Sequence, residues 1–234
     1  MRIAVAIFAL LIAVQAFAGV TCPSDFNKVN PTGVLGEDAS GYLSGCLTES
    51  QGLVDNPGTP SWDNAYIAWN ITPLTSHPGY RYEYTWSATS KAVSHVILGL
   101  SQNCTAASGC IWNIEAPAGT TTSFGNWGSG PGNPGFPAGA SFWGIKFDGA
   151  SGTTYSFSFE SDRVPVWQNF YAKDGKDGGA DVYAYNAGLG ISGENSYYVV
   201  APDTIATPEP GFYGLLSLGL AGLYLAIRRR QTAK

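Results

Sequence analysis

Positive charge is scarce in this sequence. The 234 residues contain 12 Lys or Arg against 17 Asp or Glu, and residues 19–206 alone hold seven against sixteen, a net charge near −9. Proteins that bind nucleic acid need clustered positive charge to neutralise phosphates. The composition therefore argues against nucleic acid as a partner and suits a soluble extracellular domain.

Catalytic motifs are also missing. Histidine occurs only twice, as His77 beside Pro-Gly in a predicted turn and as His95 in a strand-like run. A Ser-His-Asp triad would need one of them, and the G-x-S-x-G elbow is absent. Glu115, Glu160 and Asp162 could supply a glycosidase pair, but nearly every acidic β protein offers such carboxylates. We therefore expect a protein that is not an enzyme, with a secreted hydrolase, either a glycosidase or an esterase, as the alternative.

Metal-ligand spacings are absent as well. No paired C-x₂-C spacing supports a zinc site. Residues 173–181 could collect carboxylates around Ca²⁺, but Lys176 stands where the calcium-loop pattern needs an oxygen ligand. Two Asp-Gly steps between aromatic strands more simply predict a hairpin turn. We expect no metal and no other cofactor.

Helical periodicity is lacking between residues 19 and 206, whereas strand periodicity is present. Residues 80–86 and 155–160 alternate aromatic and polar side chains with period two, which is typical of half-buried strands. Weaker strand candidates are 65–71, 92–100, 111–115, 142–147, 164–171, 182–185 and 197–200. This pattern predicts one all-β domain over residues 19–206, an antiparallel β-sandwich or jelly roll.

The N-terminal residues 1–18 have the organisation of a signal peptide. Arg2 gives a positive start, residues 3–14 form an unbroken apolar run, and Ala16-Phe17-Ala18 is a signal peptidase site. A membrane anchor is the alternative, although the run is short and no stop-transfer charges follow it. A lipoprotein would instead use Cys22, but the residues before it lack the expected pattern. The chain is therefore predicted to be exported.

The C-terminal residues 207–234 contain three ordered parts. The tripeptide Pro208-Glu209-Pro210 precedes an uncharged, mainly apolar segment, residues 211–227, and the basic block Arg228-Arg229-Arg230 follows. As a helix this segment would be about 25 Å long, slightly short of a ~30 Å hydrocarbon core, a difference that snorkelling and local thinning can cover. We predict a single transmembrane helix with the arginines in the cytoplasm.

This order of parts resembles the PEP-CTERM sorting segment, which exosortase processes in Gram-negative bacteria. The resemblance implies transient tethering in the inner membrane, processing near the motif, and delivery to the cell surface or extracellular matrix. It also implies an association with exopolysaccharide and biofilm systems. A GPI signal has no need of terminal arginines, and the LPxTG motif of sortase substrates is absent.

The four cysteines, Cys22, Cys46, Cys104 and Cys110, lie in the exported region, where disulfides persist. Three connectivities are possible. We favour Cys22–Cys46 and Cys104–Cys110, because each pair shares a turn-rich segment. The chain-entropy model assigns about 3.5 kcal/mol to the longer loop and about 2.3 kcal/mol to the shorter.

Aromatic residues are numerous, with seven Trp and 13 Tyr. Most should pack in the core or across strands. Trp127, in a predicted long surface loop over residues 125–139, and Trp143 are candidates for stacking on sugar rings. Three functions remain open: a surface or matrix protein in contact with exopolysaccharide, a purely structural coat protein, and a secreted hydrolase. A coplanar aromatic pair in a groove would favour the exopolysaccharide contact, and a featureless surface would favour the coat protein. A His-carboxylate cleft would favour the hydrolase.

Overall fold

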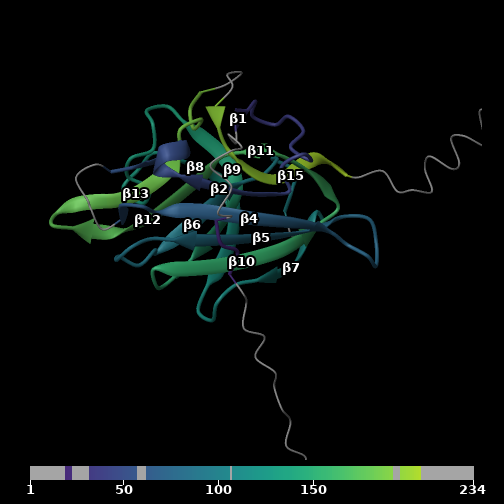
Figure 1. Cartoon of the computed structure of the whole chain (residues 1–234), viewed down its shortest axis with the longest axis horizontal. Helices are drawn as coiled ribbons and strands as arrows, with labels where there is room; N and C mark the ends of the chain where they lie inside the picture. Colours follow the sequence, from purple (N-terminus) through teal and green to yellow (C-terminus); the bar gives the residue numbers. More distant parts are fainter. Residues whose placement is uncertain (1–18, 23–31, 57–61, 106, 192–195, 207–234) are drawn as a thin grey trace, which may run out of the picture.

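The computed structural model describes residues 19–22, 32–56, 62–105, 107–191 and 196–206 (Figure 1). The predicted signal peptide, residues 1–18, and the predicted sorting segment, residues 207–234, lie outside these residues. Within the described ranges, no helix combines the length and apolarity needed to cross a membrane.

The described chain is all-β and its strand pairs are antiparallel. The five-stranded sheet has the order β2 (Ser44–Thr48), β4 (Tyr66–Pro73), β5 (Tyr80–Ser87), β10 (Thr154–Ser161), β7 (Ile111–Glu115). The six-stranded sheet has the order β3 (Leu53–Asp55), β13 (Ala180–Asn186), β12 (Phe170–Asp177), β6 (His95–Gly99), β9 (Ser141–Asp148), β8 (Thr121–Gly128). Two small pairs join β1 (Thr32–Gly33) to β14 (Ser196–Tyr197) and β11 (Arg163–Gln168) to β15 (Val199–Ala206). The one short helix described is a 3₁₀ turn, η2 (Glu49–Gln51).

The alternating residues of β5 and β10 form the centre of the five-stranded sheet. These strands pair without a register break, and Tyr84 lies directly opposite Phe157. The two rings stack with centroids 5.0 Å apart. Because side chains alternate across a strand, the tyrosines of β5 enter the core while Arg81 and Glu83 point outward.

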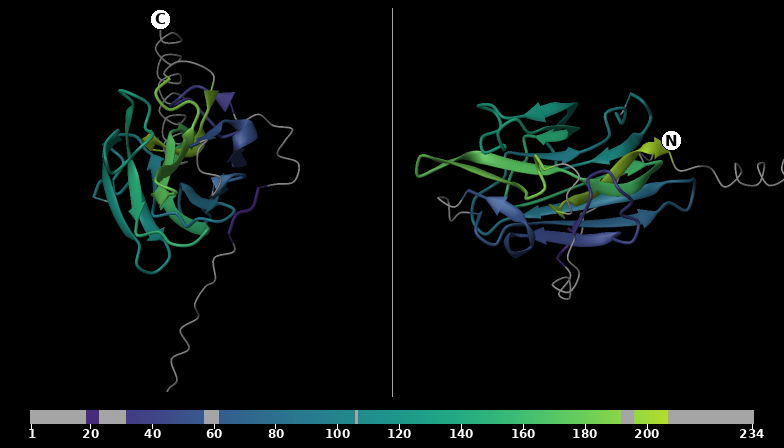
Figure 2. Two further views of the ribbon diagram at one scale, coloured as in Figure 1. Left: turned by 90° about the vertical axis from the view of Figure 1, so that its left-hand side faces the viewer. Right: turned by 90° about the horizontal axis from the view of Figure 1, so that it is seen from above.

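The two large sheets pack face to face as a sandwich (Figure 2). One core cluster contains buried side chains from both of them. Phe147 of β9 lies 4.2 Å from Phe157 of β10, and Phe170 of β12 stacks on Trp86 of β5 at 5.7 Å, both measured between ring centroids. The predicted all-β class and sandwich architecture are confirmed by this layered core.

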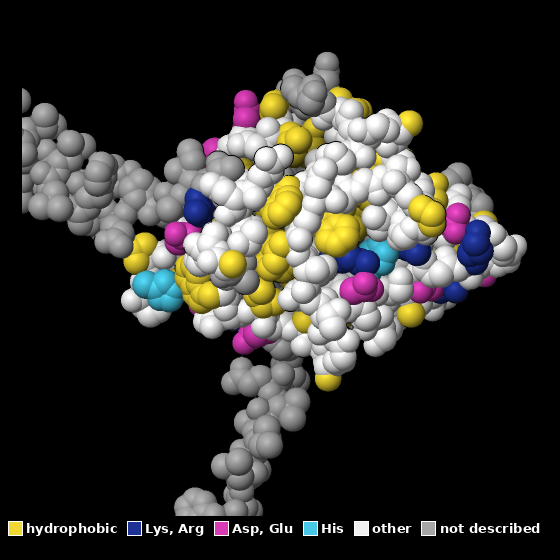
Figure 3. Space-filling view, turned by 180° about the vertical axis from the view of Figure 1, so that it is seen from behind, with side chains coloured by type: hydrophobic (Ala, Val, Ile, Leu, Met, Phe, Trp, Pro, Cys, Tyr) yellow, Lys and Arg dark blue, Asp and Glu magenta, His cyan; other side chains and the backbone are white. Residues whose placement is uncertain are grey.

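A second, smaller cluster lies on the outer face of the six-stranded sheet. Its buried members come from β6, β9, β12 and two loops: Ile97, Phe136, Phe142, Tyr171 and Leu189. Figure 3 views the molecule from behind and shows hydrophobic side chains gathered near the middle of that side. We call this set, with its half-buried neighbours Trp127, Ala140, Tyr183 and Tyr185, the outer aromatic cluster.

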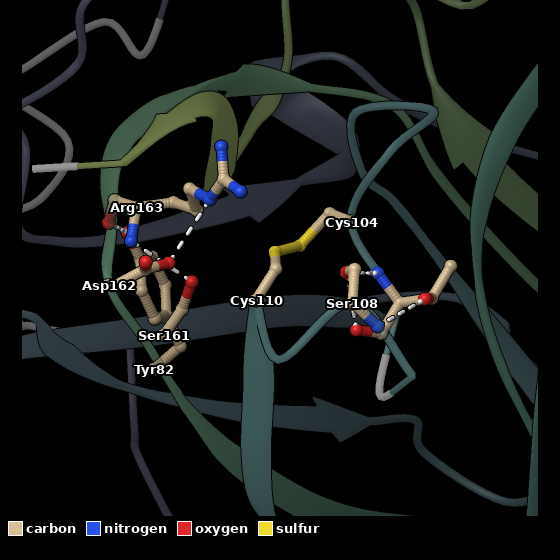
Figure 4. The surroundings of a disulfide bond; sticks show 8 residues. Tyr82, Cys104, Ser108, Cys110, Ser161, Asp162 and Arg163 are labelled. Carbon is tan, nitrogen blue, oxygen red and sulfur yellow. Dashed lines mark hydrogen bonds and ion pairs between the residues drawn. A yellow bond between two sulfur atoms is a disulfide. The ribbon is translucent and has the colours of Figure 1, made fainter.

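Two disulfides join the four cysteines in the predicted connectivity. Cys22 pairs with Cys46 of β2, with their Cα atoms 5.4 Å apart. Cys104 pairs with Cys110, which precedes β7, with their Cα atoms 5.2 Å apart (Figure 4). The first links residues 19–22 to an edge of the five-stranded sheet, and the second closes the turn that leads into the opposite edge.

Two boundaries differ from those predicted. The expected surface loop over residues 125–139 begins later, because β8 continues to Gly128 and pairs with β9 along its whole length. The expected strand over residues 164–171 is two strands, since the chain leaves β11 at Gln168, passes Asn169 and enters the six-stranded sheet as β12. Buried apolar residues stand on both sides of Asn169, so the sequence does not reveal that the strand changes sheets.

The predicted hairpin in residues 173–181 is confirmed. The turn between β12 and β13 contains Gly178 and Gly179, with φ values of 56° and 93°. Two successive positive φ angles belong to the type I′ turn, which glycine adopts without steric cost. Lys176, at the position where a calcium loop needs an oxygen, forms an ion pair with Asp181 at 3.0 Å.

Candidate functional site

The residues considered for the alternative hydrolase do not form one group. His77 lies in an exposed turn and its ring approaches Trp112, with centroids 5.4 Å apart. His95 begins β6 in the other sheet and is 4% exposed. Asp162 forms an ion pair with Arg163 at 3.0 Å (Figure 4). Of these residues, only Glu115 and Glu160 are brought together. Both contact a residue that the sequence analysis did not predict.

That residue is Arg81, which projects from the outer face of β5. Its Nε lies 3.1 Å from Glu83 Oε1, and one terminal nitrogen lies 2.6 Å from Glu115 Oε2. The other terminal nitrogen lies 3.9 Å from Glu160 Oε1. Ser158 donates to Glu115 Oε2 at 3.1 Å and accepts from Arg81 at 3.0 Å. One guanidinium therefore holds three carboxylates from three adjacent strands, β5, β7 and β10.

A β-bulge completes this arrangement. The register between β7 and β10 shifts between Ser158 and Glu160, and Asn113 of β7 has φ 47° in the left-handed region. A bulge redirects neighbouring side chains. Here the Trp112 indole and the Asn113 amide both donate to Glu160 Oε2 at 2.8 Å. A glycosidase needs one carboxyl that can protonate the leaving group, whereas each of these carboxylates is already engaged by neighbouring donors.

The loop between β8 and β9 covers part of the outer aromatic cluster. Tyr171 donates its hydroxyl to Pro134 O at 2.7 Å, and the Lys173 ammonium donates to Gly132 O at 3.1 Å. Phe136, a residue of this loop, packs its ring against Tyr171 with centroids 4.5 Å apart. The part of the predicted loop that does lack strand structure is therefore packed onto the sheet.

The two tryptophans proposed for sugar stacking lie on opposite faces of the six-stranded sheet. Trp127 is opposite Phe142 in the β8–β9 register, so its neighbour Trp143 points to the other side. Trp143 packs against the main core, whereas Trp127 packs against the outer aromatic cluster. Trp127 donates its indole N–H to Gly144 O at 3.0 Å, with the Lys146 ammonium 5.6 Å from its ring centroid. The two tryptophans therefore do not share a face, and neither ring is fully exposed. Stacking of either ring on a sugar stays a prediction.

A different aromatic pair is present on the outer face of β13. The rings of Tyr183 and Tyr185 are nearly parallel, 16° apart, with centroids separated by 6.2 Å. Both side chains are half-buried. Lys173 lies opposite Tyr183 on β12. The period-two pattern of residues 182–185 could have revealed this pair, because alternate residues of a strand share a face.

A shallow concavity of about 310 Å³ lies beside the loop between β8 and β9. Its lining residues are Leu35, Ala138, Gly139, Ala140, Ser141, Asn169, Gly190 and Ile191. None of these side chains titrates, so this concavity offers no acid or base. Among the described residues, no group of three or more His, Cys, Asp or Glu side chains is arranged to hold a metal ion.

Comparison with known proteins identifies the C-terminal segment. Residues 206–230 match the PEP-CTERM protein-sorting motif, which includes the predicted Pro208-Glu209-Pro210 and Arg228-Arg229-Arg230. No curated protein and no solved structure matches the chain. The predicted resemblance is thus confirmed, although the segment lies outside the described residues. The chain carries a PEP-CTERM sorting segment, which implies export and exosortase sorting to the cell surface in a Gram-negative bacterium.

Proposed function

We propose that this chain is a non-catalytic surface or matrix protein that contacts exopolysaccharide after exosortase has sorted it. The observation that carries the glycan part is the near-parallel Tyr183–Tyr185 pair. An apolar sugar face can stack on such rings, and the Lys173 ammonium beside them could pair with an acidic substituent. The sorting part rests on the matched C-terminal segment.

The expected affinity of one such contact is low. Stacking that buries about 50–100 Å² contributes about 1–3 kcal/mol at ~25 cal/mol/Å². A single site would therefore bind in the millimolar range or more weakly. Effective attachment to a polysaccharide then requires many copies acting together.

Replacing Pro208-Glu209-Pro210 by three alanines is expected to abolish C-terminal processing. In the host, mass spectrometry of the wild-type mature protein should show loss of residues 1–18 and of the segment after the tripeptide. The variant should retain residues 211–234 and remain in the membrane fraction, because the helix is not removed. Thr207→Ser, which leaves the tripeptide intact, is the matched control. An intact C-terminal segment in the wild-type mature pool, with exosortase present, would contradict this proposal.

Replacing both Tyr183 and Tyr185 by alanine is expected to weaken binding to the host's own polysaccharide about tenfold or more, since each 1.4 kcal/mol changes affinity tenfold. Co-sedimentation of the mature protein with that polysaccharide measures this loss. Trp127→Ala should weaken binding less, because that ring lies on β8, which is separated from the tyrosine pair on β13 by three strands. Tyr80→Ala, at a half-buried tyrosine of the other sheet, is the control. If neither wild type nor variants bind, the structural-coat function replaces the glycan contact, and glycan or ester turnover by the pure protein would favour the hydrolase.

A further inference from the structure

Strand β8 forms a long edge of the six-stranded sheet. Within the described ranges it pairs only with β9, and its eight residues keep an unbroken register. Its sequence, Thr-Thr-Ser-Phe-Gly-Asn-Trp-Gly, contains no charge and no proline. Thr121, Thr122, Ser123 and Asn126 are exposed. An edge of this kind presents unpaired N–H and C=O groups to another strand.

The other edges of the two large sheets differ from β8. β7 is bulged at Asn113 and carries Glu115. β3 has only three residues. β2 has five residues and is joined by Cys46 to the segment that contains Cys22. Short length, charge and bulges are the features that prevent sheets from pairing edge to edge, and β8 has none of them.

The charge distribution favours a second copy of this chain as the partner. Residues 116–145, which include β8 and its flanking segments, contain no charged side chain. The rest of the exported region carries a net charge near −9, which opposes approach of two copies at other surfaces. Two β8 edges can approach without bringing like charges together.

We propose that β8 pairs antiparallel with β8 of a second copy, which joins two six-stranded sheets into one. This inference goes beyond the proposed function and does not depend on glycan binding. A two-fold axis perpendicular to the sheet keeps each outer face on the same side, so the axis lies between the two strands, midway between the two copies of one β8 residue. We place it at Phe124, which sets the two Phe124 rings opposite each other and Thr122 opposite Asn126 of the second copy.

Disulfide cross-linking tests this register in the full-length chain in its host. No free cysteine occurs among the described residues, so cysteines introduced at exposed positions supply the reactive thiols. Opposed residues of an antiparallel pair have Cβ atoms about 4.5–5.5 Å apart, close to the reach of a disulfide. The double variant Thr122→Cys/Asn126→Cys should therefore form a covalent dimer on mild oxidation.

The single variants are the matched controls. In the Phe124-centred register, Thr122 lies about 14 Å along the strand from Thr122 of the second copy, too far for a disulfide. Thr122→Cys alone and Asn126→Cys alone should stay largely monomeric, whereas the two co-expressed should cross-link to each other. A monomeric double variant, equal cross-linking by each single variant, or linkage to a different protein would overturn the proposal.

A charge exchange provides a second measurement without oxidation. Thr122→Lys/Asn126→Lys places like charges opposite each other and should render the mature protein monomeric in sedimentation velocity. Thr122→Lys/Asn126→Glu places opposite charges there and should retain the dimer. Equal dimerisation of both variants, or a monomeric wild type, would also overturn the proposal.

Discussion

Trp69→Ala is expected to lower the free energy of unfolding by about 3–5 kcal/mol, the range for removing a buried tryptophan. The Trp69 side chain lies on β4 and is 0% exposed. Its indole N–H donates to Tyr42 O at 2.9 Å. Alanine would leave a large cavity and also an acceptor without this donor, and urea unfolding of the mature protein measures the loss.

The neighbouring glycine provides the matching test. Gly45 of β2 lies opposite Trp69 of β4. A Cβ atom built on Gly45 would lie 2.1 Å from the indole ring. Gly45→Ala should therefore destabilise the fold by about 1–3 kcal/mol, as overpacking does. Gly41→Ala, where a Cβ would meet nothing within 4 Å, is the control. A Trp69→Ala loss below about 1 kcal/mol would show that the site collapses around the gap.

The same pair explains which strands could be predicted from the sequence. Residues 80–86 and 155–160 were correctly predicted because each carries its own alternation of aromatic and polar side chains. β2 carries no such pattern, and its Gly45 belongs in a strand because a distant tryptophan ring covers it. Local periodicity cannot reveal a contact between residues that are far apart in the chain.

The candidate sites also differ in whether they follow from local alternation or from contacts between distant strands. Tyr183 and Tyr185 share a face through strand alternation alone. Trp127 and Trp143 belong to different strands, so their relative faces depend on the β8–β9 register, which the sequence did not reveal. The Arg81 cluster requires β5, β10 and β7 to be neighbours, although β7 and β10 are separated by the whole β8–β9 hairpin. Neither arrangement follows from residue spacing.

Acidification from pH 6.5 to pH 4 is expected to lower stability by about 3 kcal/mol through His95 alone. Burial, followed by the nearby charges of Lys146 and Lys173, lowers the pKa of His95 to about 4, while Asp148 and the hydrogen bond to Asn133 act in the opposite direction. In the unfolded chain the pKa is about 6.5. The folded state thus favours neutral histidine, so its stabilisation is complete above pH 6.5 and is lost as the pH falls towards 4.

His95→Gln isolates this contribution, since the other titrating groups remain. The difference in unfolding free energy between wild type and variant should change by about 3 kcal/mol between pH 7 and pH 4, because one pKa unit corresponds to 1.36 kcal/mol. His77→Gln, in an exposed turn, is the matched control. His95 Nε2 lies 3.1 Å from Asn133 Oδ1 in the loop over the outer aromatic cluster. Amide hydrogen exchange in residues 129–140 should therefore accelerate as stability falls, and parallel wild-type and His95→Gln curves across this range would contradict the assignment.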